Sequence, residues 1–138
     1  MLANGAKLEY KSKSVSDYTK LNGLKEIPEI GVDPEKVENT DLDDTQKMYE
    51  MGIGDPGDIT YKFKYDNTSK DSPYRVLRTY EASGENLSFK ETLKDGTTTE
   101  FTGQVSVKRT GGGVNGVIEF DLNIALSSAF EITDPEIA

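Results

Sequence analysis

The clearest pattern in the chain is the alternation of apolar and polar residues in its second half. From Ile59 to Tyr65 every second side chain is apolar or aromatic, and Lys62 and Lys64 point to the other side. A period of two is that of a β-strand with one buried face. The same alternation predicts strands over 87–93, 97–109 and 117–127. The inward positions of the last strand are Ile118, Phe120, Leu122, Ile124 and Leu126.

Between the first two of these strands the apolar spacing becomes helical. Asp71-Ser72-Pro73 predicts a helix start, with an N-cap oxygen and a proline in the first turn, and Gly84 predicts its end. Val76, Leu77 and Tyr80 form one apolar stripe, so this helix is expected to cover a sheet with one face. The side chains expected to face outwards are Arg75, Arg78 and Glu81.

The first forty residues carry weaker strand signals. Ala6–Tyr10 predicts a short strand, and Tyr18–Leu24 predicts an edge strand. Pro28 and Pro34 bracket a bend, since neither can donate to a sheet ladder. Lys36–Thr40 is expected to pair with the strand over 18–24.

A long acidic connection follows over Asp41–Asp58. Within it, Thr45–Met51 has the composition of one or two helical turns, and Asp55–Asp58 is typical of a β-turn. Loops longer than about 12–15 residues are usually functional or disordered. This segment is therefore the main candidate for an interaction element.

These elements predict one domain over residues 1–138, mainly β. The expected fold is an antiparallel β sandwich or flattened barrel with one flanking α-helix and a long acidic loop. Asp95-Gly96 is a tight-hairpin signal, and 110–116 is a flexible turn. Residues 128–138 read as a loosely held tail with apolar anchors.

Charge is concentrated in one part of the chain. Residues 25–58 hold 11 acidic and 3 basic residues, a net charge of −8, whereas all other residues together have a net charge of −1. Acidic surfaces repel nucleic-acid phosphates, so a stable grip on DNA is not expected. The segment suits a surface past which DNA slides; the alternative is a loop that is simply solvated.

The composition excludes several kinds of chemistry. The chain has no cysteine and no histidine, which removes disulfides, thiolate zinc sites, the commonest metal ligand and the commonest general base. It has no apolar run of the length of a signal peptide or a membrane span. No cofactor, metal ion or catalytic residue is expected.

Three local motifs have structural interpretations. Gly111–Gly113 is a hairpin turn and not a phosphate cradle, because a strand follows it. The acidic run from Asp41 fails the EF-hand pattern, whose sixth and twelfth places here hold Gln46 and Gly52. Glu91 interrupts the apolar face of its strand, so it is expected at an edge or bulge.

The order of motifs near the start resembles a known family. Gly5–Tyr10, Tyr18–Gly31 with its Ile-Pro-Glu-Ile-Gly bend, and Asp33–Thr40 before the acidic loop resemble the opening of tail tube proteins, also called major tail proteins, of phages with long, non-contractile tails. Residues 5–45 carry most of this resemblance. The strand-helix-strand remainder is shared with related tube-forming proteins, including those of type VI secretion systems.

The resemblance implies a structural virion protein of the phage tail, made in the bacterial host cytoplasm. It would form hexameric rings stacked into the tube through which DNA is ejected, with the tape measure and tail terminator proteins as further partners. Residues 41–57 would be the ring-stacking loop, and residues 1–17 and 128–138 would be arms that order on assembly. The stacking residues would be Asp41, Asp43, Asp44, Met48, Tyr49 and Met51.

Other surface residues are candidates on physical grounds. Glu119 and Asp121 are candidates to face the lumen, because the opposite face of their strand is core. Arg75 and Arg78 are candidates to pair with a neighbour's acidic loop. Two other functions remain open: a β-sandwich module that binds carbohydrate or a host surface, and a type VI secretion-like tube protein. An enzyme is not expected.

Overall fold

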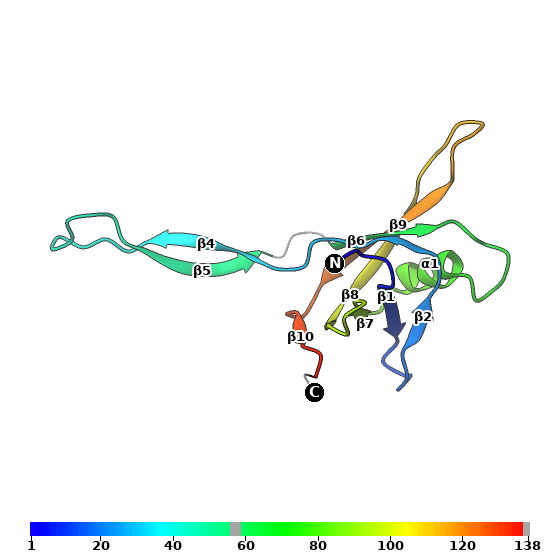
Figure 1. The fold of residues 1–138 in the computed structure, drawn as a ribbon, viewed down its shortest axis with the longest axis horizontal. Helices are drawn as coiled ribbons and strands as arrows, with labels where there is room; N and C mark the ends of the chain where they lie inside the picture. The colour runs from blue at the N-terminus through cyan, green and yellow to red at the C-terminus, as the bar shows by residue number, and fades with distance from the viewer. Residues whose placement is uncertain (56–58, 137–138) are drawn as a thin grey trace.

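The structure, a computed structural model, describes residues 1–55 and 59–136. Its described part is mainly β with one helix, as predicted (Figure 1). The elements are β1 (Lys7–Lys11), β2 (Thr19–Leu21), β3 (Leu24–Glu26), β4 (Asp33–Glu38), β5 (Tyr49–Asp55), β6 (Ile59–Lys64), α1 (Pro73–Ser83), β7 (Leu87–Thr92), β8 (Thr98–Arg109), β9 (Glu119–Leu126) and β10 (Glu131–Thr133).

The main sheet wraps around the core. Its strand order is β2-β1-β7-β8-β9-β6-β3, with β10 beside β8, and every pairing is antiparallel. β2 and β3 lie at the two ends of this order, although only Asn22 and Gly23 separate them in sequence. The prediction of one strand over 18–24 is therefore wrong, because two short strands lie there, but its position at an edge is confirmed, since β2 and β3 are the end strands of the sheet.

β8 connects the two halves of the sheet. Thr98–Gly103 pairs with β7, and Gly103–Arg109 pairs with β9. At Gly103 the strand that pairs with β8 changes from β7 to β9. A Cβ atom at this position would lie 2.5 Å from the carbonyl oxygen of Ala125. Only glycine fits this close approach of two backbones.

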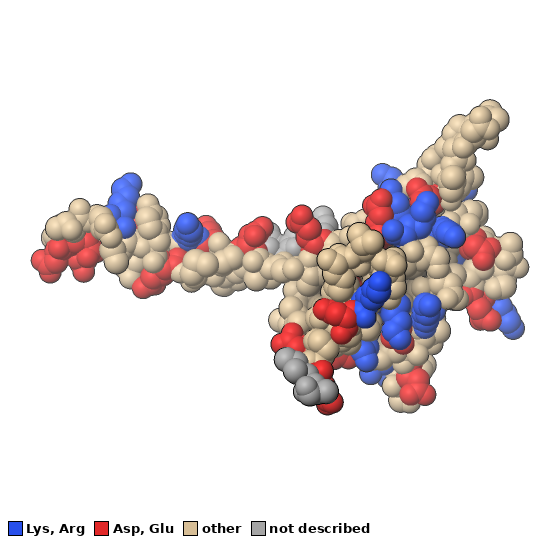
Figure 2. All heavy atoms as spheres, in the orientation of Figure 1, with Lys and Arg blue, Asp and Glu red and all other residues tan. Residues whose placement is uncertain are grey.

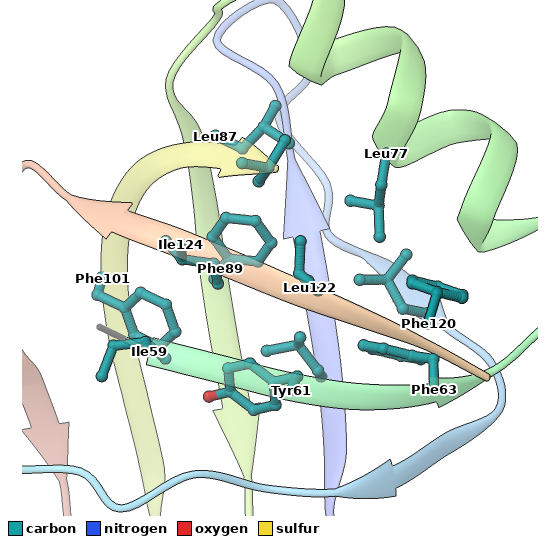
Figure 3. Close-up of a cluster of buried hydrophobic side chains, with 13 residues drawn as sticks. Ile59, Tyr61, Phe63, Leu77, Leu87, Phe89, Phe101, Phe120, Leu122 and Ile124 are labelled. Atoms are coloured by element: carbon teal, nitrogen blue, oxygen red, sulfur yellow. The ribbon is translucent and has the colours of Figure 1, made fainter. Parts of the chain in front are cut away.

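Alternating residues of the sheet build the core that the sequence predicts (Figure 3). Tyr61 stacks on Phe101 and Phe63 stacks on Phe120, with ring centroids 6.5 Å and 5.3 Å apart. The prediction that Ile118 faces the core is wrong, because β9 begins only at Glu119 and Ile118 is 46% exposed. The fully buried large side chains are Leu8, Ile59, Tyr61, Phe63, Leu77, Leu87, Phe89, Phe120, Leu122 and Ile124.

The helix has the predicted bounds. It ends at Gly84, whose φ of 70° is left-handed. Leu77 is the residue of the helix that is fully buried against the sheet. The predicted N-cap oxygen is wrong, because the Ser72 side chain makes no cap hydrogen bond. The hydroxyl of Ser72 instead accepts a hydrogen bond from the backbone N–H of Ser69 at 3.1 Å, which fixes the preceding turn.

Residues 33–55 form an arm that leaves the body of the molecule (Figure 1). β4 pairs with β5 in a separate two-stranded sheet, so the expected pairing of 36–40 with 18–24 is wrong. The expected helical turns over 45–51 are also wrong, because Tyr49–Met51 belongs to β5. The expected turn over 55–58 falls largely outside the described residues. Within the described residues, the acidic connection thus forms most of the tip and the second strand of a β-hairpin.

A second projection, the finger, consists of residues 110–118 between β8 and β9. It is a turn, as predicted, and it extends away from the body on another side than the arm (Figure 1). The backbone N–H of Thr110 donates to the carbonyl oxygen of Glu119 at 2.8 Å, so the base of the finger continues the β8–β9 ladder.

Candidate assembly surfaces

The tip of the arm, residues 39–48, is acidic and internally hydrogen-bonded. The backbone N–H of Asp43 donates to the Asp41 carboxylate, and that of Asp41 donates to the Asp44 carboxylate, both at 2.9 Å. The hydroxyl of Thr40 accepts from the backbone N–H of Met48 at 2.9 Å. These contacts hold the predicted stacking residues Asp41, Asp43 and Asp44 together in one ordered loop at the end of the arm.

The strands of the arm expose large apolar side chains. Tyr49 and Met51 lie on the same face of β5 and are 56% and 68% exposed, while Ile53 is 92% exposed. Val37 on β4 is about half exposed. A two-stranded hairpin is marginally stable in water by itself. Its exposed apolar residues make the arm a candidate contact surface.

Glu119 and Asp121 lie on the outward side of β9, as predicted. Lys25 on β3 forms an ion pair with Glu119, and the hydrogen bond from Lys25 lowers the pKa of the Glu119 carboxyl. Asp121 is paired in register with Lys62 on β6 and with Lys108 on β8. The two carboxylates therefore lie in a strip of alternating charge and not in a purely acidic patch.

A second strip of alternating charge crosses the other half of the sheet. In register, Glu9 on β1 lies between Lys20 on β2 and Lys90 on β7, and Lys90 lies next to Glu100 on β8. Sequence reasoning missed both strips. The charges are visible as outward positions of each strand, but their alignment depends on the pairing order, which no local pattern gives.

The two candidate arginines of α1 differ in their surroundings. Arg75, expected to face outwards, is instead half-buried and donates to the side-chain and backbone oxygens of Asn67 at 2.8 and 3.1 Å, while its pairing with a neighbour's acidic loop stays a prediction. Arg78 is exposed, and its guanidinium lies 5.4 Å from the ring centre of Tyr74. Arg78 keeps its charge accessible to a partner.

Glu91 is not at an edge, which corrects the expectation. It is the next-to-last residue of β7, which is an inner strand of the sheet, and it is paired in register with Leu8 on β1 and Thr99 on β8 and is 3% exposed. The hydroxyl of Tyr61, on β6, donates a hydrogen bond to its carboxylate. Burial raises the pKa of Glu91, and the hydrogen bond from Tyr61 partly offsets that rise. This contact ties the two halves of the sheet together across the core.

The described residues show no arrangement suited to metal chemistry. In residues 1–55 and 59–136, no three or more carboxylates gather as a group that could hold a metal ion. Among the same residues, no helix has the length and apolar character needed to cross a membrane. The distinctive surfaces are instead the arm, the finger and the charged strips. Figure 2 shows acidic side chains along the arm and a gathering of lysines and arginines on the body.

The fold is similar to solved structures of tail and tail-like particles. A chain of the tail of an empty GTA particle, solved with C6 symmetry, has a TM-score of 0.71 and 20% identity, with 94% of this chain and 98% of that chain covered. A chain of the anti-feeding prophage baseplate has a TM-score of 0.73 and 11% identity, with coverages of 97% and 95%. The SPP1 tail tube protein has a TM-score of 0.61 and 13% identity, with coverages of 94% and 77%.

The sequence itself points to the same kind of protein. No curated protein sequence matches the chain. Residues 1–112, however, match the model of a family described as phage tail tube, TTP, lambda-like. The chain therefore belongs to the lambda-like phage tail tube family, and it is a structural protein of the phage tail.

Proposed function

We propose that the chain assembles into hexameric rings, which stack into the hollow tail tube through which the phage DNA leaves the capsid. Membership of the tail tube family supports self-assembly, and the C6 symmetry of the similar GTA tail supports a ring of six. The observation that carries the proposal is the arm. A projecting hairpin with exposed Tyr49, Met51 and Ile53 gains stability only when a neighbour covers it.

The arm makes the contact between successive rings. Its acidic tip, with Asp41, Asp43 and Asp44, reaches a basic surface of the next subunit, while Met48, Tyr49 and Met51 bury their apolar surface there. Residues 1–17 and 128–138 add further contacts as the rings stack, through the parts that lie outside β1 and β10, since these two strands are already paired in the sheet of their own subunit. The tape measure and tail terminator proteins are the other partners of such a tube.

The lumen carries the DNA without holding it. Glu119 and Asp121 are the candidate lumen residues, and their pairing with lysines gives the wall nearly balanced charge. A wall of balanced charge releases few counterions on contact with DNA, so it binds the polyanion weakly. Passage and not catalysis is the role of this surface; the subunit is not an enzyme.

The arm contact is tested at Met51. Replacing Met51→Asp puts a charge on a surface that assembly buries, whereas Met51→Leu keeps an apolar side chain of similar size. Burying a methionine contributes about 1.5–3 kcal/mol, so loss of the contact raises the concentration needed for assembly by about tenfold or more. Negative-stain electron microscopy and size-exclusion chromatography of both variants measure this.

Two outcomes contradict the proposal. The arm has no such role if Met51→Asp forms tubes at the same concentration as the wild type. The tube function itself fails if the wild-type protein remains a monomer at every concentration while electron microscopy shows neither rings nor tubes.

A further inference from the structure

An apolar groove lies at the root of the arm. It has a volume of about 460 Å³ and uncharged lining residues, and its walls come from opposite parts of the fold. Val32 and Gly54 belong to the arm side, and Leu126, Ala129, Phe130 and Ile132 belong to the C-terminal side. Val32 and Ile132 are 52% and 58% exposed. Hollows of roughly 300–1,000 Å³ accommodate several apolar groups.

The finger has the complementary character. Its nine residues, 110–118, include no charged side chain, and the projection carries no charged atom in Figure 2. Val114 at its tip is fully exposed, and Val117 is 66% exposed. An ordered projection that presents valines and no charge to water suits insertion into an apolar site.

A finger cannot reach the groove of its own subunit. The finger joins the start of β9, and Leu126, at the end of β9, lines the groove. Eight residues of strand at about 3.3 Å each separate the two by roughly 25 Å. Any finger in the groove therefore belongs to another molecule.

Two other segments fit the groove less well. The arm tip offers the exposed Leu42, but Asp41, Asp43 and Asp44 surround it, and burying these carboxylates in an apolar groove is costly. The N-terminal residues lie elsewhere, because Ala3–Ala6 line a hollow together with Leu24 and Ile27 beside β3.

We propose that the finger of one subunit inserts Val114 and Val117 into the arm-root groove of a neighbouring copy. This inference rests on the proposed self-assembly and adds a specific contact to it. Finger and groove are different surfaces at opposite ends of β9, so the contact is heterologous. Heterologous contacts generate closed rings or helical stacks, which are the two arrangements that a tube of rings needs.

Cysteine crosslinking tests the contact, because the natural chain has no cysteine. Full-length Val114→Cys and Ala129→Cys proteins are mixed at a concentration that gives tubes, and then oxidised. We expect a disulfide between the two variants, because Ala129 lines the groove and a finger inserted there would bring residue 114 close to it; a disulfide needs Cα atoms about 4.4–6.8 Å apart. The matched control mixes Val114→Cys with Ala82→Cys, an equal substitution at an exposed position on α1 that does not line the groove.

Electron microscopy of the same samples separates the possible results. Preferential linking of the 114–129 pair supports the contact. Tubes without this link, or equal linking of the control pair, overturn it and leave the proposed function intact. The absence of rings and tubes altogether overturns the proposed function, and this inference with it.

A second pair of variants tests the chemistry of the finger. Val114→Asp is expected to raise the concentration needed for assembly at least tenfold, whereas Val114→Ile is expected to leave it within about twofold. Circular dichroism confirms that both variants fold. Equal assembly by the aspartate variant contradicts the insertion of Val114.

Discussion

Glu91 is a buried carboxyl group whose surroundings make the stability of the fold depend on pH. Its carboxyl group is in the sheet interior, and burial raises its pKa above the ordinary value. A group with a raised pKa in the folded state contributes stability below its unfolded pKa, and this contribution is lost as the pH rises through the folded pKa. Glu91 thus makes the fold less stable at neutral pH than in mild acid. The Tyr61 hydroxyl limits that loss.

Removing this hydroxyl is the test at the residue scale. In Tyr61→Phe the carboxylate of Glu91 loses its buried donor, which costs about 1–3 kcal/mol at neutral pH. The pKa of Glu91 rises further, so at lower pH the folded variant carries a neutral carboxyl group and the cost shrinks. Guanidinium denaturation of wild type and variant at about pH 7.5 and about pH 4.5 measures the difference.

Tyr10→Phe is the matched control for that experiment. It deletes the same atom from a half-buried tyrosine that packs on Tyr80 and is paired in register with Phe89, not with Glu91. We expect a small loss of stability that is independent of pH in this range. An equal cost of Tyr61→Phe at both pH values would show that the Glu91 carboxylate is not the group that needs the hydroxyl.

At the scale of elements, the close approach of β8 to β9 depends on one glycine. A Cβ atom at Gly103 would lie 2.5 Å from the Ala125 carbonyl oxygen and 2.7 Å from a methyl carbon of Ile124. Gly103→Ala must push β8 and β9 apart, and we expect a loss of about 1–3 kcal/mol. Gly111→Ala in the finger is the control. A Cβ atom there meets nothing within 4 Å, so its effect is expected to stay within about 0.5 kcal/mol.

Urea denaturation of the two glycine variants gives the answer directly. A similar midpoint for both would mean that the sheet absorbs the added methyl group at Gly103 by a small shift. A lower midpoint for Gly103→Ala alone confirms that the close approach of β8 to β9 fixes the wrap of the sheet.

Elements that bury one regular face are the ones that the sequence predicts well. β6, β7 and β8 show a period of two because one side of each contacts the core, and α1 shows a helical stripe and a glycine end for the same reason. β9 is predicted two residues too long at its start because Ile118 continues the apolar alternation. The local pattern does not reveal that the sheet ladder ends before it.

The arm escapes prediction because neither face of it is buried. All residues of β4 are exposed, so no buried face requires its apolar and polar residues to alternate. The pairing of β4 with β5 also contains a register shift between Pro34 and Lys36, which disturbs the alternation further. The candidate stacking residues come from the family resemblance and from the acidic composition of their segment, and they stay a prediction. The groove depends on the approach of residues 31–32 to residues 126–132, which no local pattern encodes.

At the scale of the whole molecule, charge is divided between two parts. The arm, residues 33–55, has eight acidic and two basic side chains, a net charge of −6 out of −9 for the chain. The outward strands of the body carry the alternating strips, in which lysines face carboxylates. Such a division favours contacts between the arm of one copy and the body of another over arm–arm contacts, which would repel.

Arg78 is the residue of the body at which this attraction can be tested. We expect Arg78→Glu to raise the concentration needed for assembly several-fold at low salt, because the exposed guanidinium would meet the acidic tip of a neighbour. Charges screen each other over about 10 Å at 0.1 M salt and about 3 Å at 1 M, so the difference from wild type should vanish at high salt. Lys70→Glu, an equal charge change at an exposed residue ahead of α1, is the control.

Sedimentation of the three proteins over a salt series measures the effect. If Arg78→Glu and wild type keep the same salt dependence, the acidic tip contacts another surface, and the lysines of the two strips become the next residues to exchange.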